Sequence, residues 1–209
     1  MIHYNLQNYY KRNVRVPRVN PHHFYNNTIE KYGDSAEGVH WNSTHSQEQR
    51  FKALRALLPT DLSDLTLVDV GCGFGHLYSY LVGNGLSIGR YLGLDIVPKM
   101  VTMARERTQC EILQLDVLVA ESLPAADYYV CSGAMNTMTQ EETYRFIERC
   151  YGACSCGFVF NLLRGADQSQ IFNYCQPYAI LEWCETLGAQ TTFKDDYLYG
   201  DFTIRMLHP

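Results

Sequence analysis

Residues 67–81 read LVDVGCGFGHLYSYL, an apolar run that meets an acidic residue and then three glycines at alternate positions. These are Gly71, Gly73 and Gly75, and each weakens a helix or strand interior by about 0.5–1 kcal/mol relative to alanine. A chain that accepts this cost needs backbone angles that other residues avoid, or needs room for a ligand or a neighbouring element against the bare backbone. Leu77 and Leu81 then resume a helical spacing.

Apolar runs and helical patterns alternate outward from this stretch. Strands are predicted at 65–70, 91–96, 111–115, 128–131 and 157–163, and helices at 47–58, 76–82, 98–107, 139–151 and 177–187. Thr139 and Glu142 form a capping-box pattern. The alternation predicts an α/β fold of three layers around a doubly wound, mostly parallel sheet. Two last runs, 191–194 and 202–207, predict an antiparallel hairpin at its C-terminal edge.

Composition places the chain among ordinary globular proteins. Its 209 residues, 46% of them hydrophobic and 19% charged, suit one sizeable core. No apolar run approaches 18 residues, and the N-terminus lacks the apolar core of a signal peptide, so we expect no membrane contact and a cytoplasmic location. The eight cysteines are then expected to be reduced. The spacing of Cys150, Cys154 and Cys156 does not match a zinc site, so no metal is predicted.

The charge distribution divides the chain into a basic arm and an acidic body. Four basic residues and no acidic ones fall within 1–25, so this arm carries +4 and the rest −9 of the net −5: Lys11, Arg12, Arg15 and Arg18. A basic arm contacts nucleic acid or an acidic substrate in some proteins, and in others is a solvated cover. The acidic body makes nucleic acid an unlikely partner.

The acidic residue before the glycines indicates which kind of ligand the turn would accept. Gly71 to Gly75 follow the first predicted strand, where open α/β sheets bind ligands. A dinucleotide fingerprint, G-x-G-x-x-G/A, is broken by His76 at its sixth position. Asp69 would repel a pyrophosphate, whereas it suits a ligand with an ammonium and a sulfonium and no phosphate. Its alternative role is to cap the turn.

With these residues the chain resembles the class I S-adenosylmethionine-dependent methyltransferases. The glycine motif is matched by VDVGCGFG, and three later motifs by YLGLDIVPKMVTMAR, LQLDVL and DYYVCSG. The resemblance implies that Asp95 binds both ribose hydroxyls and that Asp116 accepts a hydrogen bond from the adenine amino group, with Val117 beside the ring. Ser132 and Gly133 would face cofactor and substrate at the end of the fourth strand. The implied architecture is the Rossmann-like methyltransferase fold.

The resemblance implies S-adenosylmethionine as cofactor and S-adenosylhomocysteine as product. Asp95 also has an alternative role as N-cap of the helix that begins at Pro98, and Ile96 and Met100 are alternatively core residues. The implied cofactor-binding residues are Asp69, Gly71, Cys72, Gly73, Gly75, Asp95, Ile96, Met100, Asp116, Val117, Ser132 and Gly133.

Residues 1–58 are predicted to form an N-terminal arm and lid helix, and residues 59–209 the cofactor-binding domain. In the helix at 47–58 an apolar stripe includes Phe51 and Leu54, and Arg50 is expected off that stripe, able to reach the carboxylate of the cofactor. Trp41 is expected to close over the site. A purely structural role for Arg50 and Trp41 remains the alternative.

Methyl transfer needs positioning more than catalytic groups, so no residue is assigned a firm catalytic role. His22, His23 and Tyr199 are the candidates for a catalytic role, the two histidines because they titrate near neutral pH. The segment CSGAMN, 131–136, lacks the [DN]-P-P-[YF] motif of amino-methyltransferases acting on DNA and glutamine. We therefore expect a small-molecule acceptor, methylated at oxygen or nitrogen by a monomer or homodimer. The alternatives are a non-catalytic or partner-dependent domain and an enzyme that uses a modified form of the cofactor.

Overall fold

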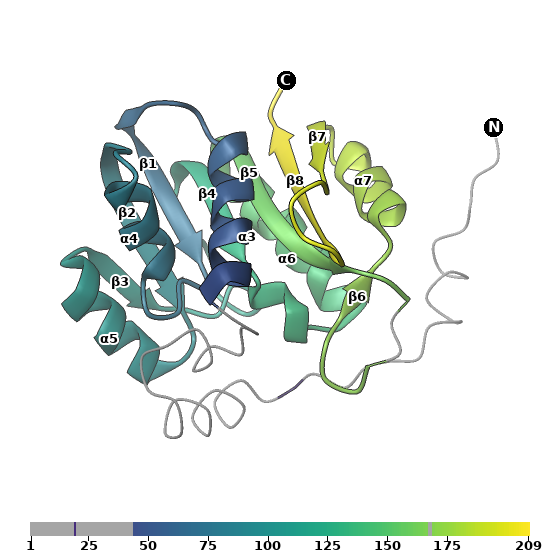
Figure 1. Cartoon of the computed structure of the whole chain (residues 1–209), viewed down its shortest axis with the longest axis horizontal. Helices are drawn as coiled ribbons and strands as arrows, with labels where there is room; N and C mark the ends of the chain where they lie inside the picture. The colour runs from purple at the N-terminus through teal and green to yellow at the C-terminus, as the bar shows by residue number, and fades with distance from the viewer. Residues whose placement is uncertain (1–18, 20–43, 167–168) are drawn as a thin grey trace.

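The computed structural model describes residue 19 and residues 44–166 and 169–209 (Figure 1). The helices are α3 (Thr44–Leu57), α4 (His76–Gly83), α5 (Pro98–Thr108), α6 (Gln140–Ala153) and α7 (Pro177–Thr186), with a short 3₁₀ helix η2 (Ala134–Thr137). The strands are β1 (Leu62–Val70), β2 (Ile88–Asp95), β3 (Glu111–Gln114), β4 (Ala126–Ser132), β5 (Cys154–Arg164), β6 (Tyr174–Cys175), β7 (Gln190–Lys194) and β8 (Asp201–Leu207).

These strands form one mixed sheet in the order β3-β2-β1-β4-β5-β8-β7, and β6 pairs with β5. The first five strands run parallel, whereas β8 is antiparallel to both β5 and β7. The order reverses at β1, because the chain goes outward to β3 and returns to β4 on the other side. The predicted fold class, including the antiparallel C-terminal hairpin, is confirmed.

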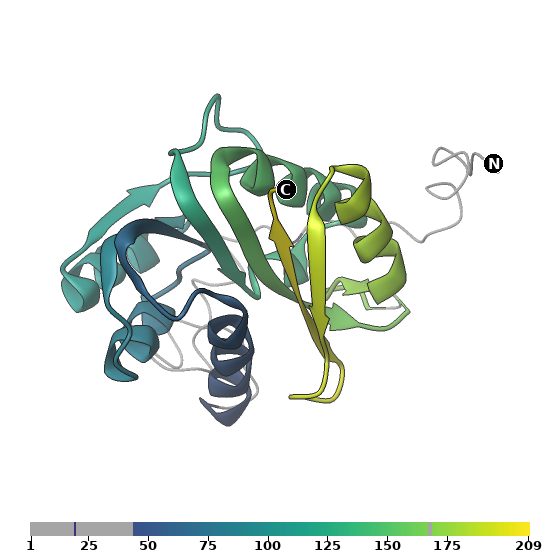
Figure 2. The same ribbon diagram turned by 90° about the horizontal axis from the view of Figure 1, so that it is seen from above.

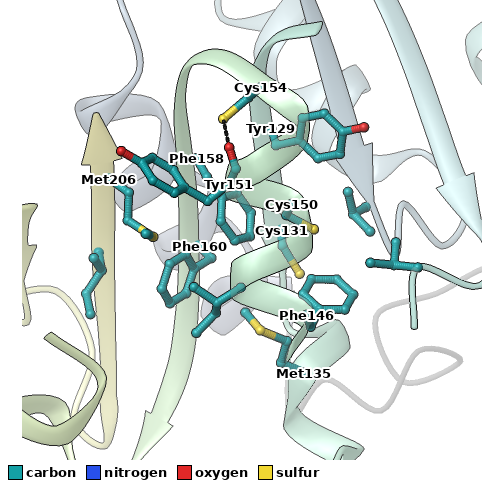
Figure 3. Packing of buried hydrophobic residues seen from close by; sticks show 14 of the residues in the cluster. Tyr129, Cys131, Met135, Phe146, Cys150, Tyr151, Cys154, Phe158, Phe160 and Met206 are labelled. Carbon is teal, nitrogen blue, oxygen red and sulfur yellow. Dashed lines mark hydrogen bonds between the residues drawn. The ribbon is translucent and has the colours of Figure 1, made fainter. Parts of the chain in front are cut away.

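Helices cover both faces of the sheet and bury a separate apolar core on each (Figures 1 and 2). The core beneath α6 and α7 contains Phe146, Phe158, Phe160 and Met206, packed as Figure 3 shows. The core on the other face is shared by α3, α4 and α5, with Leu54 of α3 completely buried. The helix before β1 is therefore part of the three-layer body.

Local sequence signals explain where α5 and α6 begin. Thr139 caps α6 through the predicted capping box, because its hydroxyl accepts from Glu142 N at 3.2 Å while the Glu142 carboxylate accepts from Thr139 N at 2.9 Å. Pro98 begins α5, where its missing N–H costs nothing. The N-cap of α5 is Val97, so the alternative of Asp95 as N-cap is wrong. Within the described residues, no helix is long and apolar enough to cross a membrane.

Candidate functional site

A cleft opens at the carboxyl ends of β1, β2 and β4, on either side of the point where the strand order reverses. It is the place at which open α/β sheets bind ligands. The structure brings nearly all of the implied cofactor residues into its lining: Asp69, Gly71, Cys72, Gly73, Asp95, Ile96, Met100, Asp116, Val117, Ser132 and Gly133. Gly75 is not among the lining residues and acts instead in the turn itself.

The structure of the glycine turn explains why glycines stand at positions 71 and 75. Gly71 has φ +72°, and a Cβ there would lie 2.3 Å from the Cβ of Ala134. Gly75 has φ +78°, and a Cβ there would lie 2.5 Å from Thr108 Cγ2. These positions need glycine for both reasons, a left-handed backbone and a close neighbour. The turn is further tied to α5, because the Arg107 guanidinium donates to the carbonyl of Phe74 at 2.8 Å.

Asp95 ends β2 and holds two backbone groups with one carboxylate. Its Oδ2 accepts from Gly73 N and its Oδ1 from Val97 N, both at 2.9 Å. Each carboxylate oxygen has two lone pairs, so these bonds leave capacity for ligand donors. Asp95 thereby joins the glycine turn to the start of α5 and keeps a buried carboxylate in the cleft lining.

Asp69 lies on β1 at the base of the cleft and is almost completely buried. The hydroxyl of Tyr91, on the neighbouring strand β2, donates to Asp69 Oδ2 at 2.7 Å. Burial raises the pKa of Asp69 to about 7, although the hydrogen bond from Tyr91 opposes this shift. The carboxyl group is thus poised between its neutral and charged forms near neutral pH.

Asp116 follows β3 and is half-buried at the same edge of the sheet. Its Oδ1 accepts from Leu118 N at 2.9 Å, which fixes the carboxylate in a turn of residues 116–118. Val117, beside it, is buried and lines the cleft. The acids at the ends of three strands therefore reach one cleft, as the sequence predicts.

The cleft lining also includes residues that sequence reasoning did not assign to it. Gln47 and Phe51 of α3 and His76 of α4 line it, and Gln47 Nε2 lies 3.3 Å from His76 Nδ1. Burial lowers the pKa of His76, which favours its neutral form. Gln47 and Phe51 are four residues apart and so share a helix face. This spacing is the only sequence pattern from which their common position could have been predicted.

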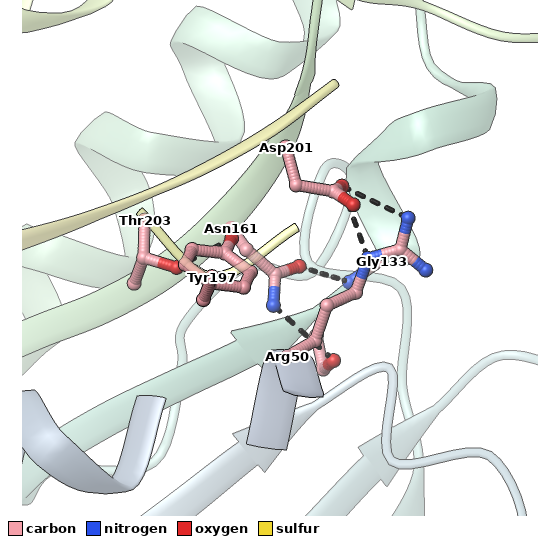
Figure 4. A network of polar contacts seen from close by, with 7 residues as sticks. Arg50, Gly133, Asn161, Tyr197, Asp201 and Thr203 are labelled. Atoms are coloured by element: carbon pink, nitrogen blue, oxygen red, sulfur yellow. Dashed lines mark hydrogen bonds and ion pairs between the residues drawn. The ribbon is translucent and has the colours of Figure 1, made fainter. Parts of the chain in front are cut away.

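Arg50 is placed differently from its prediction. It lies on the buried face of α3 and is bound to Asp201, with Nε and Nη2 at 3.0 and 2.9 Å from Asp201 Oδ1 (Figure 4). It is not among the cleft-lining residues. The prediction that Arg50 sits off the buried stripe is wrong, because the sheet beneath α3 offers this arginine a buried carboxylate.

The end of β4 is held by a neighbouring amide. Asn161 on β5 is buried, and its Oδ1 accepts from Gly133 N at 3.1 Å while its Nδ2 lies 3.5 Å from Ser132 Oγ (Figure 4). Asn161 is the one asparagine in the apolar strand sequence GFVFNLL, and this contrast is the only sign in the sequence that it has a polar partner.

Only one of the three catalytic candidates, Tyr199, lies among the described residues. Tyr199 is fully exposed in the β7–β8 loop and does not line the cleft, so the structure places it away from the site. His22, His23 and Trp41 lie outside the described residues.

The comparisons with known proteins agree with this geometry. Residues 67–157 match the family model described as a methyltransferase domain. The chain is 28% identical over 148 residues to "Putative methyltransferase Rv1506c" of Mycobacterium tuberculosis, covering 65% of this chain and 89% of that protein.

Two solved structures share the fold. The first, "Complex between the Haloferax volcanii Trm112 methyltransferase activator and the putative methyltransferase", has a TM-score of 0.69 at 17% identity, covering 89% of this chain and 97% of that one. The Synechocystis PCC 6803 magnesium protoporphyrin IX methyltransferase with bound S-adenosylmethionine has a TM-score of 0.62 at 16% identity, covering 99% and 92%. This chain therefore contains a class I S-adenosylmethionine-dependent methyltransferase domain, and its cofactor is S-adenosylmethionine.

Proposed function

We propose that this chain transfers the methyl group of S-adenosylmethionine to an oxygen or nitrogen of a small-molecule acceptor. The observation that carries the proposal is the convergence of Asp69, Asp95 and Asp116 with the glycine turn in one cleft. The class of enzyme follows from the family, whereas the acceptor and the roles of individual residues belong to this proposal.

The chemistry of the cleft fits the cofactor. A buried acid at the base of the glycine turn disfavours a pyrophosphate and favours a ligand that carries positive charge there, as a sulfonium and an ammonium do. Asp95 keeps lone pairs for two vicinal hydroxyls while it holds the turn. Asp116 and Val117 offer an acceptor and an apolar surface to a flat heterocycle. We assign Asp69 to the charged end, Asp95 to the ribose and Asp116 with Val117 to the adenine.

In the proposed reaction the protein mainly binds, orients and excludes water. The cofactor supplies a methyl group that its sulfonium already makes electrophilic. Ser132 and Gly133, held by Asn161, would form the wall between cofactor and acceptor. Gln47, Phe51 and His76, which also line the cleft, would help to keep solvent out. A base is needed only for an acceptor that arrives protonated, and His22 and His23 stay predictions for that role.

The remaining proposals concern partners and location. We propose a small-molecule acceptor because residues 131–136, CSGAMN, lack the [DN]-P-P-[YF] motif of amino-methyltransferases acting on DNA and glutamine. Nucleic acid is not the proposed substrate, and the active form is a monomer or homodimer. All eight cysteines lie among the described residues and are free, which is the state a reducing compartment such as the cytoplasm maintains.

Two measurements test the proposal. Calorimetry should show binding of S-adenosylmethionine and S-adenosylhomocysteine and negligible binding of NAD; the reverse preference would contradict the assigned cleft chemistry. Incubation with cofactor labelled in its methyl group and fractionated small-molecule extracts, followed by mass spectrometry, should show a labelled product. Tight cofactor binding without label transfer in any fraction would favour a partner-dependent or non-catalytic domain instead.

A further inference from the structure

The first half of α3 contacts two parts of the molecule at once. Gln47 and Phe51 line the cleft, and Gln47 reaches His76 at the start of α4. Arg50, on the same buried face, points to β8 and binds Asp201 (Figure 4). A single turn of helix therefore carries both a cleft wall and an attachment to the C-terminal hairpin.

The attachment is a buried ion pair. The side chains of Arg50 and Asp201 are 9% and 3% exposed, and two guanidinium nitrogens share one carboxylate oxygen. Burying two charges costs several kcal/mol of desolvation, so such a pair contributes little net stability, yet removing one partner is strongly destabilising. Such a pair instead fixes a position: the two buried charges are compensated only when α3 lies where Arg50 contacts Asp201.

The partner side of the pair is rigidly placed. Asp201 begins β8 and lies opposite Leu163 in the antiparallel ladder with β5. At the C-terminal end of α3, Arg205 of the same strand donates to the carbonyl of Leu57 at 3.4 Å. The middle and the C-terminal end of α3 are thus attached to one strand that is itself paired on both sides.

We infer that Arg50 and Asp201 are a positioning pair, whose contact holds the first turns of α3 so that Gln47 and Phe51 form the wall of the cofactor cleft. Neither residue lines the cleft. Their effect on the reaction passes through α3, and the C-terminal hairpin thereby becomes a support of the active site. This inference rests on the proposed function, because it takes the cleft to be the cofactor site.

The test uses the full chain with Asp201→Asn, which removes the charge and keeps the shape, and with Arg50→Met, which removes the guanidinium. Glu111→Gln is the matched control, because its exposed pair with Arg90 lies on β2 and β3, away from α3. Calorimetry measures the affinity for S-adenosylmethionine, and hydrogen exchange compares the amides of α3 with those of β1. All measurements are made well below each variant's melting temperature.

We expect about tenfold weaker cofactor binding in both variants, the change that follows if the first turns of α3 occupy their docked position in about a tenth of the molecules. Exchange should rise in residues 47–51 and stay unchanged in β1, and Arg50→Lys should restore part of the affinity. The control should match the wild type. If Arg50→Met does not fold, Asp201→Asn alone decides.

Each outcome separates the inference from the proposed function. Protection of 47–51 that is unchanged in the ligand-free variants overturns the inference, whatever the cofactor does. Exchange that rises equally in α3 and β1, with wild-type affinity, also overturns it, because the pair would then stabilise the whole fold. A wild-type protein that binds no S-adenosylmethionine overturns the proposed function, and the inference with it.

Discussion

Asp95 shows how one carboxylate serves structure and ligand together. Its two oxygens hold the N–H groups of Gly73 and Val97, so the turn that would face the cofactor depends on the residue that would bind the ribose. Asp95→Ala is expected to weaken the binding of S-adenosylmethionine by about 1–3 kcal/mol, the cost of an unmade charged hydrogen bond. Calorimetry measures this loss.

The control for that variant is Asp61→Ala. Asp61 also accepts a backbone N–H, from Ser63 at 2.9 Å, but it is exposed and does not line the cleft. Its removal should leave cofactor affinity at the wild-type value. Unchanged affinity in Asp95→Ala would mean that the carboxylate only organises the turn.

Asp69 should make cofactor preference depend on pH. Its pKa is raised by burial to about 7 from 3.8, so the stability it contributes is fully present below about pH 4 and is lost as the pH rises through about 7. Ionised Asp69 favours a sulfonium, and S-adenosylhomocysteine has none. The affinity ratio of S-adenosylmethionine to S-adenosylhomocysteine should therefore rise between about pH 6 and 8, as calorimetry can measure.

Asp69→Asn should abolish this rise, because the amide does not titrate. His76, whose pKa is lowered by burial, is present in both the wild type and the variant. Any effect of its titration on ligand binding therefore remains in Asp69→Asn. A ratio that is flat in the wild type would show that Asp69 does not sense the sulfonium.

Single residues were predictable where chemistry and strand ends coincide. Asp69, Asp95 and Asp116 each follow an apolar run, so the sequence alone brings them to one edge of a parallel sheet. Arg50 and Asp201 were not paired in this way, because 151 positions separate them and only the return of β8 along β5 brings them together. No local pattern records such a contact.

At the scale of elements, the glycine turn and the loop after β4 fit each other at one point. A Cβ on Gly71 would lie 2.3 Å from that of Ala134, and its φ of +72° adds strain of about 1–3 kcal/mol for any other residue. Gly71→Ala should therefore lower thermal stability and cofactor affinity together. Melting curves and calorimetry measure the two effects.

Two further variants separate strain from collision. Gly85→Ala meets a similar φ of +79° with no atom within 4 Å of the new Cβ, so it should show the strain alone. Gly71→Ala with Ala134→Gly removes the colliding methyl and should recover most of the lost affinity. A double variant no better than Gly71→Ala would show that the two elements do not depend on this contact.

The elements that sequence reasoning missed are short or set by tertiary contacts. β6 has two residues, and η2 has four, too few for any periodicity to appear. Both follow from packing: Asn173, next to β6, is completely buried and donates to Thr143 Oγ1 of α6 at 2.8 Å. The longer strands and helices were predicted well, because each carries a turn signal and an apolar face of its own.

At the scale of the whole molecule, the division at residue 58 remains a prediction. The described part of the chain shows that α3 shares a core with α4 and α5 and is attached to β8, so the helix predicted as a lid is also a structural member of the three layers. The basic arm, residues 1–25 with a charge of +4, lies before α3 in the sequence. The contribution of this arm to the site and the contribution of α3 are therefore tested by two different truncations.

Deleting residues 1–40 is expected to leave a folded domain with weaker cofactor binding and no methyl transfer. The described core, from α3 to β8, is retained in this truncation, so circular dichroism and a cooperative melting curve should resemble those of the full chain. The arm is expected to dock over the cofactor, and without it the sulfonium would meet water. Label transfer from methyl-labelled cofactor measures the activity.

Deleting residues 1–58 is the contrasting truncation. It removes Phe51 and Leu54 from the core and leaves Asp201 buried without its guanidinium partner, so this form should unfold or aggregate. Hydrogen exchange of the full chain adds a direct test, because cofactor should protect residues near Trp41 as well as the glycine turn. Full activity in the shorter truncation, or no protection near Trp41, would show that the arm serves a partner instead of the site.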